Sequence, residues 1–184
     1  MTLFRETADV SVRPAVAGDE SAIVDIQVGA WRGAHGDLLA GALDVLDLDA
    51  MRAQWAAAVT TPPAGHRVLV ACAGATVVGF ASVAPVPATR AGDAPGGLLL
   101  ALEVDPAHQR AGHGSRLLAA AVDLLREDGA DQVQTWVLDG DSARAQFLSG
   151  AGLGPDDTVR ELASDTLPDG TTRTVREHRW WATI

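Results

Sequence analysis

The sequence contains no lysine and no tyrosine, and all 14 of its basic residues are arginine. Without lysine, neither a pyridoxal-phosphate Schiff base nor the phosphate-binding lysine of a P-loop can form. Without tyrosine, no phenol is available as a general acid. The sequence also lacks a Gly-x-Ser-x-Gly elbow, and its single cysteine, Cys72, lies in an apolar run. The sequence therefore offers no good nucleophile for a mechanism through a covalent acyl-enzyme.

Metal ligands and export signals are scarce too. The five histidines form no His-Glu-x-x-His motif, and His108 and His113 flank a turn without carboxylates or thiolates at ligand spacing. One cysteine cannot form an internal disulfide, which suits a reducing compartment. No run approaches ~18 apolar residues, and the polar start from Thr2 to Asp9 has no signal-peptide core. We predict a soluble, cytoplasmic protein with no metal and no membrane contact.

The sequence has fewer basic residues than acidic ones. The net charge of −10, with a pI near 4.7, would repel a phosphate backbone, and no basic stripe interleaved with aromatics is present. A nucleic-acid partner is therefore not expected. The acidic excess serves solubility, or alternatively attracts a cationic substrate. The length of 184 residues and the hydrophobic share of 47% predict one domain over residues 10–184 after a tail of residues 1–9.

The most informative stretch joins an apolar strand to an amphipathic helix. Residues 98–104 read as a buried strand, Val-Asp-Pro ends it, and a Gln-x-x-Gly-x-Gly motif at 109–114 opens the helix. The glycines allow a tight turn, and the amides of residues 110–115 have no intrahelical partners. With the positive end of the helix dipole behind them, these amides predict a site for a pyrophosphate.

A second block follows at residues 132–153, with a strand, a turn, a short helix and a closing Gly-Leu. Together the two blocks resemble motif A and the following strand and helix of the GCN5-related N-acetyltransferase (GNAT) superfamily. The resemblance extends over the chain from about Val10. It implies an α/β (α+β) fold with a mixed central sheet, a V-shaped splay between the two central parallel strands, and helices on both faces.

The rest of the chain is predicted from its periodicity and its turn residues. We expect two helices, a hairpin, a surface loop and a closing hairpin that turns near residues 168–170. Their predicted bounds are Asp19 to about Trp31, about Asp47 to Val59, 67–73 with 76–83, Pro85 to Gly97, and Val159 to Ala163 with Thr174 to Ala182. Adjacent Trp180 and Trp181 point to opposite faces of a strand, which hints at a homodimer contact.

The resemblance implies acetyl-CoA as cosubstrate. Its pyrophosphate would lie on the turn before the helix, and its pantetheine arm along the preceding strand, where a backbone amide polarises the thioester. His113, between the glycines, is expected to pack inward. The implied binding residues are Leu102, Glu103, Val104, Gln109, Arg110, Ala111, Gly112, His113, Gly114, Ser115, Asp141, Arg144 and Phe147.

An acceptor amine with a pKa near ~10 must lose a proton before it attacks. Glu103 is the first candidate base, because carboxylates on this strand serve that role in some relatives. The alternative for Glu103 is a strand residue that faces solvent, and Asp139 is the weaker carboxylate. His35 lies in the segment that usually walls the acceptor pocket, where it is a base, a substrate contact or an ordinary exposed histidine.

The sequence departs from the family at two positions. Leu148 stands where a tyrosine commonly protonates the departing thiolate, which leaves water or Ser149 as donor at a cost of ~10²-fold in rate. Asp141 replaces the usual asparagine. We predict an N-acetyltransferase that moves an acetyl group to a primary amine of a small molecule or peptide by direct attack in a ternary complex. The alternative is a catalytically weak acyl-CoA-binding module with a regulatory or sensing role.

A Rossmann dinucleotide site is disfavoured, because Leu117 stands where the third glycine would be.

Overall fold

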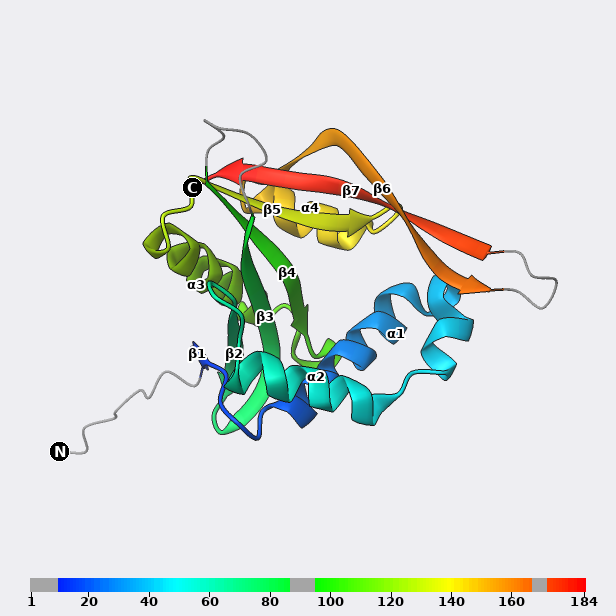
Figure 1. Cartoon of the computed structure of the whole chain (residues 1–184), viewed down its shortest axis with the longest axis horizontal. Helices are drawn as coiled ribbons and strands as arrows, with labels where there is room; N and C mark the ends of the chain where they lie inside the picture. Colours follow the sequence, from blue (N-terminus) through cyan, green and yellow to red (C-terminus); the bar gives the residue numbers. More distant parts are fainter. Residues whose placement is uncertain (1–9, 87–94, 167–171) are drawn as a thin grey trace.

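A mixed sheet of seven strands, in the order β1-β2-β3-β4-β5-β7-β6, runs through the computed structural model, which describes residues 10–86, 95–166 and 172–184 (Figure 1). The strands are β1 (Val10–Pro14), β2 (Arg67–Ala73), β3 (Thr76–Val86), β4 (Gly96–Val104), β5 (Gln132–Leu138), β6 (Gly154–Thr166) and β7 (Thr172–Thr183). The helices are α1 (Glu20–Asp44), α2 (Leu48–Thr60), α3 (His113–Glu127) and α4 (Ser142–Gly150), with a short 3₁₀ helix, η1 (Pro106–His108).

The sheet divides between β4 and β5. These two strands are parallel, whereas the other neighbouring strands pair antiparallel. Their pairing covers only residues 96–98 against 132–134, and the Thr135 hydroxyl then donates to the Leu99 carbonyl at 2.9 Å. Figure 1 shows β4 running away from β5 beyond this point. The predicted V-shaped splay is confirmed.

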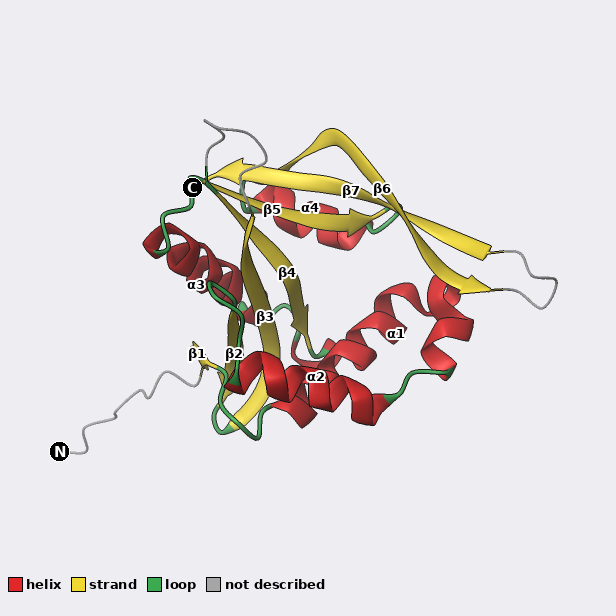
Figure 2. Cartoon of the chain, in the orientation of Figure 1, coloured by secondary structure: helices red, strands yellow, loops and turns green. Residues whose placement is uncertain are grey.

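Helices cover both faces of the sheet, as predicted (Figure 2). On one face the buried core joins β2–β5 to α3 and α4, and on the other it joins β2 and β3 to α1. Side chains alternate between the faces, since Leu69 and Ala71 of β2 belong to the first cluster and Val68 and Val70 to the second. Among the described residues, no helix is long and apolar enough to cross a membrane.

Helix α1 is longer than predicted. It continues past Trp31 to Asp44, with one non-helical residue, His35, at φ −135° and ψ 18°. Glycines in this segment weaken the helical pattern of the sequence, because glycine is a poor helix former. In the structure, a Cβ added to Gly29 or Gly33 would lie 3.9 or 3.8 Å from the Pro106 ring. These glycines therefore lie where α1 packs closely against η1.

The predicted loop from Pro85 to Gly97 is wrong at both ends. Strand β3 extends to Val86 and β4 begins at Gly96, while residues 87–94 between them lie outside the described residues. A Cβ on Gly97 would lie 2.4 Å from Cδ2 of Leu125, so this glycine allows α3 to pack directly on β4. The glycine thus marks a close approach of two elements and not a turn.

Hairpin β6–β7 is also longer than predicted at both strands. Its predicted turn at 168–170 lies outside the described residues, as does the predicted tail at 1–9. Trp180 packs against the core, whereas 40% of Trp181 is exposed. The alternation expected of a strand is therefore observed, and a homodimer through Trp181 stays a prediction.

Candidate active site

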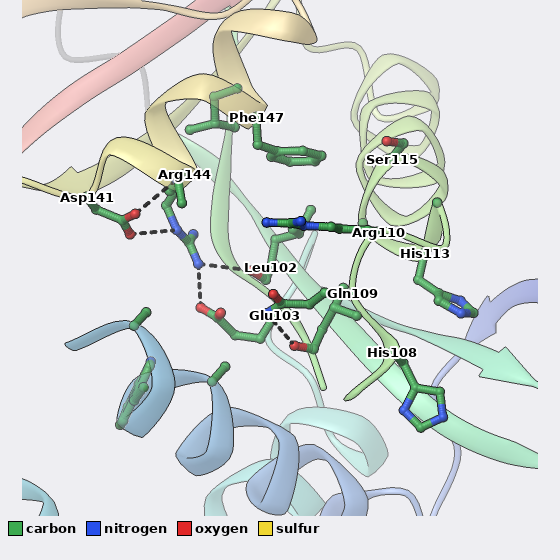
Figure 3. Close-up of a pocket in the computed structure, with 18 of the residues that line it drawn as sticks. Leu102, Glu103, His108, Gln109, Arg110, His113, Ser115, Asp141, Arg144 and Phe147 are labelled. Carbon is green, nitrogen blue, oxygen red and sulfur yellow. Dashed lines mark hydrogen bonds and ion pairs between the residues drawn. The ribbon is translucent and has the colours of Figure 1, made fainter. Parts of the chain in front are cut away.

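A cavity of about 350 Å³ occupies the splay, between α1, the open end of β4, the turn before α3, and α4 (Figure 3). Its lining brings together the predicted binding residues of β4, of the turn and of α4. Ala111 is the one member of that set that does not line it. The Ala111 carbonyl instead accepts a hydrogen bond from Nη1 of Arg116 at 3.1 Å.

The turn between β4 and α3 is built by local hydrogen bonds and two left-handed residues. Asp105 accepts a hydrogen bond from the amide of Ala107 at 2.8 Å, which starts η1. Arg110 and Gly112 then adopt positive φ values of 61° and 83°. The amide of Arg116 makes the first bond within the helix, to the Gly112 carbonyl at 3.1 Å. Within the part of the chain that the structure describes, the amides of residues 110–115 donate no hydrogen bond to another backbone group, which suits them to bind an anion.

The second glycine of the motif has a different reason to be there. A Cβ on Gly114 would meet the Phe147 ring at 3.6 Å and Val104 at 3.7 Å, which are ordinary contacts. Packing therefore tolerates a methyl group, but that methyl would project into the cavity. Figure 3 shows the Arg110 side chain extending across the same space, which adds positive charge. The turn thus fits the anionic end of a CoA ester.

His113 packs inward, as predicted, with 3% of the residue exposed. Burial lowers its pKa, and the nearby Arg116 and His108 lower it further, so the imidazole is neutral at physiological pH. Within the described part of the chain, its Nδ1 atom is buried without a hydrogen-bond partner. His113 consequently contributes no charge to the anion site.

The open edge of β4 presents backbone groups to the cavity. Nη2 of Arg144 donates to the Leu102 carbonyl at 3.0 Å, and Nε2 of Gln109 donates to the Val104 carbonyl at 3.3 Å. These carbonyls bond side chains at the level where β5 has diverged. Because the amide and carbonyl of one residue point to the same side of a strand, the amides of Leu102 and Val104 also face the gap. This edge can pair with an extended ligand.

Four charged or ionisable side chains, which we call the charged cluster, meet at the inner end of the cavity: His35, Glu103, Asp141 and Arg144. Nη2 of Arg144 donates to Oε1 of Glu103 at 2.6 Å, and the Arg144 amide donates to Oδ1 of Asp141 at 2.9 Å (Figure 3). Nε2 of His35 lies 3.3 Å from Oδ2 of Asp141. Each of the four side chains is at least three-quarters buried.

The alternative interpretation of Glu103, as a strand residue that faces solvent, is wrong, because only 15% of its side chain is exposed. Burial raises the pKa of Glu103 above the ordinary carboxyl value, although Arg144 and then His35 lower it in part. A carboxylate in this state is a stronger base than one in water. Its catalytic role stays a prediction.

The other candidate donors and bases differ in position. His35 is buried at the helix break and is not the exposed loop histidine of its alternative reading. Asp139 has 66% of its side chain exposed and lines neither this cavity nor a second cavity next to it. Leu148 is 2% exposed and lines the cavity, whereas Ser149 is exposed and lies outside it. The geometry thus favours water over Ser149 as a proton donor.

The links within the charged cluster were not anticipated. One signal was available, because Asp141 and Arg144 have the spacing of an N-cap and the third residue of a helix, and the structure shows that cap. The contact from Arg144 to Glu103 spans 41 residues and had no such signal. Among the described residues, no group of three or more histidine, cysteine or acidic side chains could hold a metal ion.

Comparisons with known proteins agree with this geometry. Residues 29–152 match the model of the acetyltransferase (GNAT) family. No curated protein matches the chain. Solved structures similar over 95% of the chain include the PaiA N-acetyltransferase of Thermoplasma acidophilum in complex with coenzyme A, at 14% identity, 99% coverage of that chain and a TM-score of 0.74.

Two further structures are similar over the same share of this chain. The ribosomal-protein-alanine N-acetyltransferase of Brucella melitensis is 21% identical, with 99% of its chain covered and a TM-score of 0.70. YncA of Salmonella typhimurium, solved with its cofactor acetyl-CoA, is 20% identical, with 94% covered and a TM-score of 0.62. At these identities the similarity concerns the fold.

Proposed function

The chain belongs to the acetyltransferase (GNAT) family of acetyl-CoA-dependent enzymes, and from this premise we propose that it acetylates a primary amine of a small molecule or peptide by direct attack in a ternary complex. The observation that carries the proposal is the position of Glu103. This buried carboxylate lies at the open end of β4, in the same cavity as the anion-binding turn. A base and a seat for the acyl donor are thus adjacent.

The turn and the β4 edge together bind the donor. Free amides before Arg116 and the Arg110 guanidinium bind the pyrophosphate, and the edge of β4 at Leu102 and Val104 aligns the pantetheine arm. Acetyl-CoA supplies an activated thioester. A backbone amide of the β4 edge donates to the thioester carbonyl oxygen and stabilises the charge that develops there.

Glu103 accepts the proton of the incoming amine, directly or through one water. Its raised pKa brings it closer to that of the amine, while the hydrogen bond from Arg144 stabilises its ionised form. His35 is the second candidate base. If its Nε2–H donates to Asp141, its Nδ1 atom carries a lone pair that can take the proton.

Arg144 also stabilises the departing thiolate, which a tyrosine commonly protonates in relatives. Its guanidinium lies at the splay, beside Leu148 in the cavity lining. A fixed positive charge there stabilises the negative charge that grows on sulfur as the thiolate departs. Because a thiol has a pKa near ~8.5, the thiolate is a tolerable leaving group and water can supply the proton.

The proposal is tested by incubating the protein with acetyl-CoA and a panel of primary amines. N-acetylated product with stoichiometric release of CoA, seen by mass spectrometry, is the expected result. Intersecting initial-rate patterns and an unmodified protein mass support direct attack, whereas an acetylated protein that passes its acetyl group to the amine contradicts it. Tight CoA binding with no product from any amine would instead support an acyl-CoA-binding module.

A further inference from the structure

A second cavity, of about 360 Å³, shares its wall with the first. The charged cluster and Trp31 line both cavities. The rest of the second cavity comes from the end of α1 and from β4, β5, β6 and β7. A molecule in it can therefore reach Glu103 from the side opposite the turn that binds the anion.

Away from the charged cluster, the walls of the second cavity are mostly apolar. In β5, Val133 and Val137 pack into the core shared with α3 and α4, so Trp136 and Leu138 face the other way and line this cavity. Two further lining residues, Leu100 and Leu162, are 51% and 40% exposed. Large apolar side chains exposed together in a cavity are typical of a binding surface for an apolar group.

Charge is unbalanced at only one end of the second cavity. In the charged cluster, Arg144 is the one permanent cation and faces two carboxylates, Glu103 and Asp141, so the cluster favours a further cation beside them. Near the other end, Glu177 is paired with Arg160, whose guanidinium carbon also lies 4.2 Å from the centre of the Trp136 ring. This second pair is already neutral. It offers no charge to a second ionic group on the ligand.

Resting on the proposed function, we infer that the acceptor is a small primary amine on an uncharged apolar body, alkyl or aryl, with its nitrogen at Glu103 and its body against Trp136 and Leu162. The volume falls in the range of about 300–1,000 Å³ found for small-molecule sites. Helix α1 and strand β6 both line this cavity and contact each other, so its volume is bounded on that side and suits a small acceptor better than an extended peptide.

Two probes of equal length test the inference. Hexylamine and cadaverine differ only by a terminal methyl in place of a second ammonium. We expect kcat/KM for hexylamine to exceed that for cadaverine by about 10-fold or more, because the second ammonium would be desolvated without a partner. An alanine-initiated tetrapeptide, as a peptide probe, should be acetylated more slowly than hexylamine.

Matched variants on β6 locate the effect. Leu162→Asp should raise the KM for hexylamine by about 10-fold and reduce its advantage over cadaverine, because the carboxylate attracts the distal ammonium. Val159→Asp is the control, since Val159 is 44% exposed on the same strand and lines neither cavity. Neither variant should change the affinity for CoA, measured by calorimetry.

The outcomes separate the two proposals. Preferred acetylation of cadaverine or of the peptide, or an unchanged KM in Leu162→Asp, overturns the inference and leaves the acetyltransferase function standing. Failure to acetylate any amine, measured with protein shown to be folded, overturns both.

Discussion

The two halves of the sheet differ in how completely their faces are buried. In the half from β1 to β4, strands β2 and β3 have a packed core against each face, and Val70, Ala71 and Phe80 are essentially inaccessible to solvent. In β5 and β7, one face joins the core with α4, while the other face, together with β6, lines the second cavity and leaves Leu162 of β6 partly exposed. The first half maximises burial. In the second half, part of the apolar surface stays exposed and is available to a ligand.

Strand β4 belongs to both halves. At residues 96–98 it pairs with β5 and closes the sheet, and at residues 102–104 it turns the same edge toward the cavity. The contrast predicts that changes at the open end affect catalysis, and that changes at the paired end or in the first half affect stability.

The largest effect is expected at the open end. Glu103→Gln should lower the acetylation rate by about 100-fold at neutral pH, because the amine loses its base. In the unchanged protein, activity should rise with pH as Glu103 ionises, and its raised pKa places this rise above the ordinary carboxyl range. The variant should lack that rise and lose less activity at high pH, where free amine is present. A pH–rate profile parallel to that of the unchanged protein would remove Glu103 from the mechanism.

At the paired end, Gly97→Ala should lower the free energy of unfolding by about 2 kcal/mol, because the new methyl overlaps Leu125. Chemical denaturation measures the loss. Gly154→Ala is the control, since a Cβ there meets nothing within 4 Å. Combining Gly97→Ala with Leu125→Ala should cost less than the sum of the two single changes, and strict additivity would contradict the overlap.

Arg144→Gln tests the link between the cluster and the reaction. Arg144 lowers the pKa of Glu103, so its removal should raise that pKa further and shift the rising part of the pH–rate profile to higher pH. At neutral pH the rate should fall by about 10-fold. Arg126→Gln, at an exposed arginine of α3, should leave the profile in place. A lower rate with an unshifted profile would contradict the coupling of Arg144 to Glu103 and leave Arg144 only its proposed role at the departing thiolate.

The smallest effect is expected in the first half. Asp19, beside α1, accepts two hydrogen bonds from Arg13 and one from the Val16 amide, and these bonds hold its pKa below the usual range. The stability it provides is complete above the unfolded pKa near ~4 and is lost as pH falls through the lower folded value.

Asp19→Asn should therefore cost about 1 kcal/mol at neutral pH, a modest figure because Arg13 is partly exposed. The difference from the unchanged protein should shrink at acid pH, and the affinity for CoA should not change. A constant difference across pH would contradict the role of the ion pair.

Sequence patterns predicted the first half and the turn well, because local rules govern them. The apolar runs of β2 and β3 on either side of Gly74, and the glycines before α3, are readable within a few residues. The long α1 and the start of β4 at Gly96 were missed, because a glycine looks the same in a sequence whether it breaks an element or admits a neighbour. Gly33 lies within α1 without breaking it, and Gly97 admits the Leu125 side chain.

The candidate site divides in the same way. The turn before α3 is local and its form was predicted, together with the inward packing of His113. The burial of Glu103 and its contact with Arg144, and the contact of His35 with Asp141, depend on how β4, α4 and α1 converge at the splay. Such contacts between distant segments leave no periodic signal in one sequence.

Binding of acetyl-CoA in the splay, on the turn before α3, can be measured by titrating CoA into Gly114→Ala and Gly150→Ala in a calorimeter. Both changes add one methyl where the protein has room, but only the one at Gly114 projects into the cavity. We predict that Gly114→Ala weakens CoA binding by about 10-fold or more at unchanged thermal stability, while Gly150→Ala binds like the unchanged protein. Equal affinity in the two variants would contradict the account.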